Sequence, residues 1–157
     1  MAYDPKKAWE YAHKWALSRN PKYYDFEKLG GNCTNFVSQC IYAGCGSMNY
    51  TKNTGWYYNS LNDRAPAWTG VEYFYKFMTR NKGKGPHATE IDLADVKPGD
   101  IIQLSFQGFA FTHTAFVLAI DETEVWLAQN SDDYLFRALS THDYKKIRVL
   151  RITDCKM

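Results

Sequence analysis

Residues 30–45 have the sequence GGNCTNFVSQCIYAGC, and this stretch predicts a helix whose first turn carries a cysteine. The glycine pair interrupts the chain, and apolar side chains then recur at helical spacing. These apolar positions are Phe36, Val37, Cys40 and Ile41. We expect the helix to start at Asn32 and to run to Gly44, which serves as its stop signal.

Cys33 is a candidate nucleophile because of its place in this helix. The first turn of a helix presents free backbone N–H groups and the positive end of the helix dipole. Both stabilise a thiolate, which is the nucleophilic form of cysteine. The alternative is packing, because Cys33 aligns with Phe36, Val37 and Cys40 on the apolar face. Position alone leaves both interpretations open.

The segments on either side predict two more helices. A first helix is expected to start at Asp4-Pro5, a capping acid followed by a first-turn proline, and to end near residues 19–21. Its apolar stripe consists of Ala8, Trp9, Ala12, Trp15 and Ala16. A third helix is expected to start at residues 69–72 (TGVE), which have capping-box spacing. Residues 82–86 end it in a solvated loop.

From residue 96 onward the apolar period changes to two, which predicts strands. The alternating apolar residues of the first strand, expected to be half-buried, are Ile102, Leu104 and Phe106. Three more strands are expected over residues 113–120, 124–131 and 147–152. Helices followed by closely linked strands predict an α+β fold, with N-terminal helices packed on a C-terminal antiparallel β-sheet. Residues 1–157 are expected to form one domain.

The composition excludes several classes of protein. The chain has 157 residues, of which 45% are hydrophobic and 23% charged, so it is long and apolar enough to fold without a disulfide. The net charge of +2 is small and dispersed, which argues against nucleic acid as a partner. No apolar run approaches the roughly 20 residues of a membrane-spanning helix. The opening, MAYDPKK, lacks the apolar stretch of a signal peptide. As written, the chain is expected in the cytoplasm, unless a trimmed leader or a non-classical route exports it.

The cysteines and histidines show no metal-ligand spacing, so we expect neither a metal site nor a cofactor. They are Cys33, Cys40, Cys45 and Cys155, and His13, His87, His113 and His142. Cys40 and Cys155 are expected to be small core or terminal residues.

His113 is a candidate base for the thiol. It lies in the predicted strand 112–120, where alternation places it on one face with Ala115, Val117 and Ala119. A face of small residues leaves room for a helix to pack closely. If the Cys33 helix packs there, thiol and imidazole can meet. The alternative is a polar histidine near the end of a strand.

Hairpin geometry adds a third candidate, Asn130. A two-residue turn at 121–122 would pair His113 with Asn130, whose amide oxygen could fix the imidazole tautomer. A four-residue loop would place Asp132 opposite His113, with Asn130 still on the same face. A three-residue loop without a bulge would move both to the other face. Gln129 is expected on the face opposite His113. Cys–His–Asn is a recurrent nucleophilic triad, and Asp132 is the alternative orienting residue.

Four segments carry a resemblance to a known family. They are GGNCTNFVSQ (30–39), AWT (67–69), KPGDIIQ (97–103) and HTAFV (113–117). They resemble the bacterial "putative amidase domain" family, within the NlpC-type branch of papain-like cysteine peptidases. The resemblance implies a papain-like fold, with Cys33 as nucleophile, His113 as base and a third polar residue that maps onto Asn130. Two positions depart from the family pattern: Asn32 stands where Asp is usual, and Asn130 where close relatives often carry His.

These observations predict a cysteine-dependent amide-bond hydrolase, an amidase or peptidase of the thiol protease type. His113 would take the thiol proton and later protonate the leaving amine, and the backbone N–H of Cys33 would help to hold the oxyanion. The resemblance suggests cell-wall (peptidoglycan) peptides as substrate, and we expect a monomer. An acyltransferase or thioesterase could use the same site. A catalytically silent cell-wall-binding module is a further alternative.

Residues 45–68 predict an irregular, aromatic segment. Trp68, next to the expected cap at residue 69, is predicted to lie in the core. Trp56, Tyr57 and Tyr58 follow an expected exposed turn, and we predict that at least one of them binds substrate on the approach to Cys33. The alternative is an aromatic cluster packed under its own loop.

Overall fold

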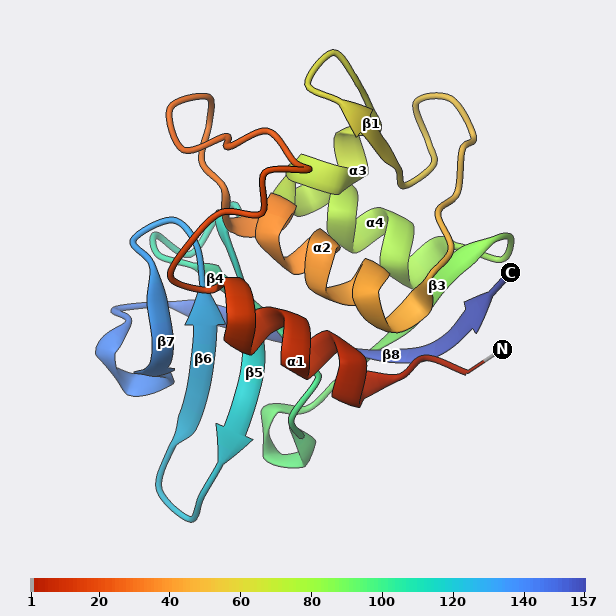
Figure 1. Ribbon diagram of the computed structural model, residues 1–157. Helices are drawn as coiled ribbons and strands as arrows, with labels where there is room; N and C mark the ends of the chain where they lie inside the picture. Colours follow the sequence, from red (N-terminus) through yellow and green to blue (C-terminus); the bar gives the residue numbers. More distant parts are fainter. Residues whose placement is uncertain (1) are drawn as a thin grey trace.

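The computed structural model describes residues 2–157 and has an α+β fold, with helices covering one face of an antiparallel sheet (Figure 1). The sheet has six strands in the order β3-β8-β4-β5-β6-β7. The helices are α1 (Pro5–Trp15), α2 (Cys33–Cys45), α3 (Pro66–Thr69) and α4 (Val71–Arg80), with 3-10 turns η1 (Leu93–Asp95) and η2 (Leu139–Thr141). The strands of the sheet are β3 (Gly85–Ile91), β4 (Ile101–Ser105), β5 (His113–Ile120), β6 (Val125–Gln129), β7 (Tyr134–Ala138) and β8 (Lys146–Lys156). A separate small sheet pairs β1 (Tyr58–Ser60) with β2 (Asp63–Arg64).

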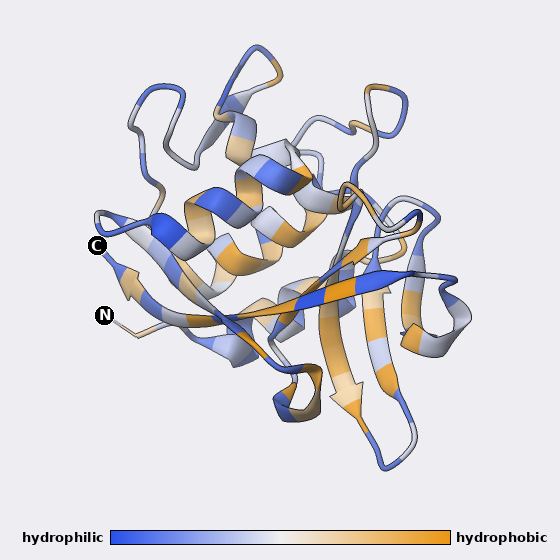
Figure 2. Cartoon of the chain, turned by 180° about the vertical axis from the view of Figure 1, so that it is seen from behind, coloured by the Kyte–Doolittle hydropathy of each residue, from blue (hydrophilic) through white to orange (hydrophobic). Residues whose placement is uncertain are grey.

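The central strands are buried on both faces. On the helix side, Phe116 and Leu118 of β5 join one apolar cluster with α1, α2 and α4. On the far side, Val117 joins a second cluster, to which η2 contributes Leu139. All five residues of β4 are consequently buried, so the prediction of a half-buried strand is wrong. Figure 2 shows apolar colour along these strands, whereas the turn that projects between β5 and β6 is polar.

The helix boundaries partly follow the predictions. Asp4 caps α1 by accepting hydrogen bonds from the first-turn backbone, as predicted, but α1 already ends at Trp15. Helix α2 ends at Cys45, and Gly46, with φ of 72°, adopts the left-handed conformation that was expected at Gly44. Gly44 instead permits a close approach, because a Cβ there would lie 2.5 Å from the carbonyl oxygen of Asp4.

The capping box predicted for the third helix is absent from this part of the structure. Gly70 is the N-cap of α4 and offers no side chain. Thr69 belongs to the short helix α3, which was not predicted, and its hydroxyl accepts a hydrogen bond from Nε of Arg64 at 3.1 Å.

Strand β5 has the predicted bounds, whereas two strands of the six-stranded sheet were missed. Strand β3 begins at Gly85, inside the segment predicted as a loop, because it pairs along its whole length with β8. Strand β7 follows a tight turn after β6. Both are outer strands of the sheet, and their sequences alternate weakly.

A disulfide joins Cys45 at the end of α2 to Cys155 near the end of β8, with Cα atoms 5.5 Å apart. The expectation that Cys155 is an unpaired small residue is therefore wrong. The two cysteines are 110 residues apart, and they meet because β8 runs beneath the C-terminal end of α2. Cys40 is free and buried, as predicted.

Among residues 2–157, no helix combines the length and the apolar character that crossing a membrane requires.

Candidate active site

Cys33 lies in the first turn of α2, against the start of β5. The hydroxyls of Thr34 and Thr114 are hydrogen-bonded at 2.9 Å and join these two elements. Cys33 and His113 are the residues that precede these threonines. The backbone N–H of Thr114 also acts on the Cys33 thiol, whose pKa it lowers. The thiol and the backbone of Thr114 are therefore close together.

Burial determines the charge of the Cys33 thiol. It raises the pKa of the thiol above its usual value, and this effect exceeds the opposing hydrogen bonds from the backbone of Thr114 and from Thr34. Burial therefore opposes the thiolate that the helix terminus was expected to favour. A nucleophilic Cys33 needs a base that removes its proton during attack.

Helix α2 packs on the opposite face of β5 from the one predicted. Phe116 and Leu118 lie on the helix side, whereas Ala115 and Val117 lie in the far cluster. The larger side chains fill the space beneath the helices, and the smaller ones pack against the far layer. In the described residues, no hydrogen bond joins Sγ of Cys33 directly to the ring of His113.

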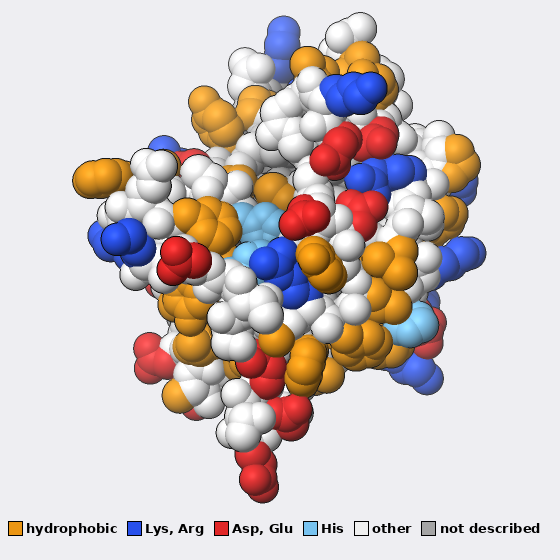
Figure 3. Space-filling model, turned by 90° about the vertical axis from the view of Figure 1, so that its left-hand side faces the viewer, with side chains coloured by type: hydrophobic (Ala, Val, Ile, Leu, Met, Phe, Trp, Pro, Cys, Tyr) orange, Lys and Arg blue, Asp and Glu red, His pale blue; other side chains and the backbone are white. Residues whose placement is uncertain are grey.

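The buried His113 ring has a polar partner from β6 and another from beyond β7. Its Nε2 lies 3.3 Å from Oε1 of Gln129, and the His142 ring lies 5.3 Å away, centroid to centroid. Burial, and after it the neighbouring His142, together lower the pKa of His113 to about 4. His113 is therefore neutral near pH 7 and can accept a proton. On the side of the molecule drawn in Figure 3, a histidine lies at the floor of a hollow with acidic and basic side chains on its rim.

A β-bulge decides which residue faces His113. The β5–β6 loop has four residues, one of the lengths considered from the sequence. The register then shifts between Val117 and Ala119. The paired residues are Ile120–Val125 and Ala119–Trp126 before the shift, and Val117–Leu127 and Phe116–Ala128 after it. A one-residue shift exchanges the two faces. Gln129 consequently faces His113, and the predicted opposition of Asn130 to His113 is wrong.

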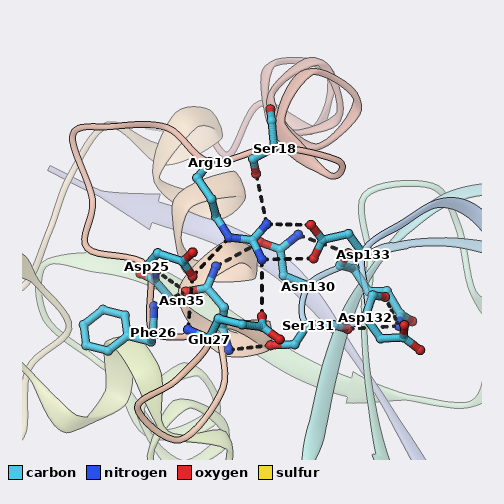
Figure 4. Close-up of polar contacts among 12 residues, drawn as sticks. Ser18, Arg19, Asp25, Phe26, Glu27, Asn35, Asn130, Ser131, Asp132 and Asp133 are labelled. Atoms are coloured by element: carbon cyan, nitrogen blue, oxygen red, sulfur yellow. Dashed lines mark hydrogen bonds and ion pairs between the residues drawn. The ribbon is translucent and has the colours of Figure 1, made fainter.

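Asn130 instead holds the start of the cysteine helix (Figure 4). Its Oδ1 accepts a hydrogen bond from Nδ2 of Asn32 at 2.9 Å, and its Nδ2 donates to the carbonyl of Ala16 at 2.8 Å. Oδ1 of Asn32 accepts hydrogen bonds from the backbone N–H of Phe26 and from Nδ2 of Asn35. This buried amide network fixes the residue that precedes Cys33.

Asp132, the alternative orienting residue, is exposed and forms an ion pair with Arg137 at 3.6 Å. Its carbonyl oxygen accepts a hydrogen bond from Nε2 of Gln129 at 3.0 Å. Asp132 is thus linked to His113 by hydrogen bonds through Gln129, and its charge also acts on the imidazole.

Arg19 anchors the segment between α1 and α2 (Figure 4). Its guanidinium forms ion pairs with Asp25 at 3.1 Å, Glu27 at 3.3 Å and Asp133 at 2.8 Å. Asp133 lies in the β6–β7 turn, so Arg19 ties this turn to the loop that leads into Cys33. The contact with Asp133 could not be predicted from the sequence, because 114 residues separate it from Arg19.

Comparisons with known proteins identify the family of this chain. The model of a family described as "Putative amidase domain" matches residues 2–152. The chain belongs to this family. The family's description indicates amidase activity. The "Uncharacterized protein YhbB" of Bacillus subtilis (strain 168) is 36% identical over 124 residues, which cover 76% of this chain and 38% of that protein. No solved structure matches the chain.

Two of the aromatic residues in this amidase-family chain form part of the core. Trp68 is fully buried, as predicted. Trp56 is also fully buried, packs against Trp68 with ring centroids 4.6 Å apart and donates from Nε1 to the hydroxyl of Ser38. Trp56 therefore offers no surface to a substrate, and the prediction that at least one of the three aromatic residues binds substrate rests on Tyr57 and Tyr58. Its indole fills the space between α2 and α4.

Tyr57 and Tyr58 are half-buried. Tyr57 packs against Tyr50, with ring centroids 5.4 Å apart. The hydroxyl of Tyr58 accepts a hydrogen bond from the backbone N–H of Tyr24 at 2.7 Å, and the carbonyl of Tyr24 accepts one from Nδ2 of Asn35. Tyr58 is thus two contacts away from the first turn of the cysteine helix.

Sequence reasoning missed two polar residues of the site, Gln129 and His142. Gln129 was assigned to the wrong face because a bulge has no clear signature in an apolar strand. His142 follows η2 in a segment without a periodic pattern, so nothing in the sequence connected it to His113. Within residues 2–157, no three His, Cys, Asp or Glu side chains gather as a group that could hold a metal ion.

Proposed function

We propose that this chain is a cysteine-dependent amide-bond hydrolase of the NlpC-type, papain-like class, with Cys33 as nucleophile, His113 as base and Gln129 as the residue that orients the base. The observation that carries the proposal is the 2.9 Å hydrogen bond between the hydroxyls of Thr34 and Thr114, the residues that follow Cys33 and His113. It joins the first turn of α2, which carries the thiol, to the residue that follows the candidate base.

The contacts of Gln129 support the assignment of His113 as base. Nε2 of Gln129 donates to the carbonyls of Asp132 at 3.0 Å and Ser131 at 3.4 Å, so its Oε1 end faces His113. An amide oxygen only accepts hydrogen bonds, so the imidazole donates from Nε2. Neutral His113 then has its lone pair on Nδ1, which is free to take a proton.

The proposed reaction starts from a neutral thiol and a neutral imidazole. Nδ1 of His113 removes the thiol proton while Sγ of Cys33 bonds to the amide carbon. The resulting imidazolium protonates the leaving amine as the C–N bond breaks, which leaves a thioester on Cys33. Water then attacks the thioester, with His113 again as base, and releases a carboxylic acid. The backbone N–H of Cys33 is our candidate donor to the oxyanion. Catalytic hydrogen bonds often tighten only when substrate binds, so a direct thiol–imidazole bond is expected in the complex.

Cell-wall peptides are the substrate class that we propose. The Cys45–Cys155 disulfide supports this choice, because structural disulfides persist in the oxidising compartments outside the cytoplasm. Tyr57 and Tyr58 retain exposed surface and are the aromatic residues that we assign to the substrate approach. Acyl transfer from the same thioester is the second candidate, since nothing in the site distinguishes water from another acceptor.

The test is incubation with purified peptidoglycan, followed by mass analysis of the released fragments. Hydrolysis adds one water and creates one new amine, and a conjugate with an added amine acceptor would indicate transfer. Cys33→Ala should release nothing. Cys40→Ala is the matched control, because Cys40 is the other free cysteine and is buried seven positions along the same helix. Equal release by Cys33→Ala and the unmodified protein would refute the mechanism.

A further inference from the structure

Two histidines share one acceptor at the candidate site. Nε2 of His142 lies 2.8 Å from Oε1 of Gln129, and Nε2 of His113 lies 3.3 Å from the same oxygen. The two rings come from separate segments, the start of β5 and the residue after η2. The closer contact belongs to His142, which has no part in the reaction proposed above.

We propose that His142 is a positioning residue, which clamps the Gln129 carboxamide and so holds His113 in the tautomer with its lone pair on Nδ1. This inference rests on the proposed function, because it deepens the role assigned to His113. The carboxamide is held at both ends: two backbone carbonyls bind its nitrogen, and His142 binds its oxygen. Without His142, the oxygen would keep only the longer contact to His113.

The surroundings of the pair favour a fixed arrangement. The ring of Phe106 lies 6.4 Å from that of His113 and 6.0 Å from that of His142, so one aromatic side chain packs against both. His113 is buried, whereas His142 keeps partial exposure to solvent. His142 is therefore the member of the pair that joins the buried base to the surface.

Charge couples the two rings. The charged and titratable groups that face His142 are His113 from β5, Arg137 from β7 and Asp132 from the β6–β7 turn. Burial and Arg137 lower the pKa of His142 to about 4, and Asp132 opposes this. Both rings are neutral near pH 7. A proton on His142 at lower pH would place a positive charge beside His113 and make His113 a weaker base.

The experiment compares two kinds of substitution at His142. His142→Leu and His142→Phe remove the hydrogen-bond donor, whereas His142→Gln keeps an N–H that can reach Gln129. The readouts are the rate of Cys33 alkylation by iodoacetamide against pH, and the nitrogen-15 shifts of His113, which report its tautomer. We expect the donor-free variants to slow alkylation at pH 7 by about tenfold and to mix the tautomers of His113. His142→Gln should restore both.

A double-mutant cycle with His113→Ala separates positioning from a general structural effect. If His142 acts through His113, its replacement should have no further effect once His113 is absent. His87→Leu is the matched control, because His87 lies on β3, away from β5 and β6 in the sheet, and its Nε2 contacts the carbonyl of Gly83. It should leave alkylation unchanged.

Three outcomes would overturn the proposal for His142: an unchanged tautomer in the donor-free variants, equal losses in His142→Gln and His142→Leu, or additive effects in the cycle. Failure of the proposed function has a different signature. In that case His113→Ala would not change alkylation and peptidoglycan would stay intact, whereas the tautomer measurement would still decide the role of His142.

Discussion

Breaking the Cys45–Cys155 disulfide should lower the stability of the fold by a large and calculable amount. The bond closes a loop with a sequence separation of 110 residues. Chain entropy alone predicts a loss of about 4.8 kcal/mol on opening a loop of this size. Cys45 is 5% exposed and Cys155 0%, so the two thiols should remain packed after reduction and add little to this loss. For a chain of this length, the loss corresponds to a decrease of about 10–19 °C in melting temperature.

The assay is thermal unfolding with and without reductant, combined with a count of free thiols in denaturant. Two free thiols are expected before reduction, from Cys33 and Cys40, and four after it. Cys33→Ala should show the full decrease in melting temperature on reduction. The double variant Cys45→Ala/Cys155→Ala should have a low melting temperature that reductant does not change. An unchanged melting temperature while the count rises from two to four would refute the entropic argument. Four thiols in the protein isolated under air would refute the bond itself.

Three further predictions concern the site and its support. The folded-state pKa of His113 lies near 4, below the ordinary 6.5, so the unfolded chain binds its proton first; stability should be full above pH 6.5 and fall by about 3 kcal/mol toward pH 4. Urea unfolding across this pH range checks this prediction. An equally steep pH dependence of stability in His113→Gln would contradict it. Trp56→Ala should cost about 3–5 kcal/mol in the same assay, because the indole is fully buried; a loss below 1 kcal/mol would place it on the surface. Trp9→Phe should cost about 1–3 kcal/mol by removing the donor to the carbonyl of Leu118, and an unchanged midpoint would show that this bond contributes nothing.

Local chemistry made much of the fold predictable. Asp4-Pro5 identified the start of α1, and the alternation after residue 112 identified β5 with its observed bounds. The failures occurred where distant contacts determine structure. Strand β3 forms because β8 lies beside it, and Cys155 is oxidised because the same strand carries it to the end of α2. Such pairings between distant segments cannot be predicted from a short stretch of sequence.

The candidate site likewise combines features that local sequence predicts with features that distant contacts determine. Cys33 and His113 could be singled out from their positions in one helix and one strand, and the hydrogen bond between Thr34 and Thr114 brings these segments together. The residue that faces His113 could not be identified, because the face on which a residue of β6 lies depends on the length of the β5–β6 turn and on the register along the strand. One extra residue in β5 reverses every later assignment on β6. The four-residue loop alone would have kept Asn130 on the face of His113, and the bulge exchanged it for Gln129.

The bulge has a physical cause that links the first helix to the site. At Leu118 the register shifts, and its carbonyl accepts a hydrogen bond from Nε1 of Trp9 at 2.8 Å. The indole satisfies this carbonyl in a strand that is buried on both faces, which favours the bulged register. That register gives two consecutive residues separate tasks on opposite faces: Gln129 contacts His113, and Asn130 holds the start of α2 through Asn32. The proposed nucleophile and base are thus both supported by neighbouring residues at one strand end, so a change that removed the bulge would misplace both supports at once.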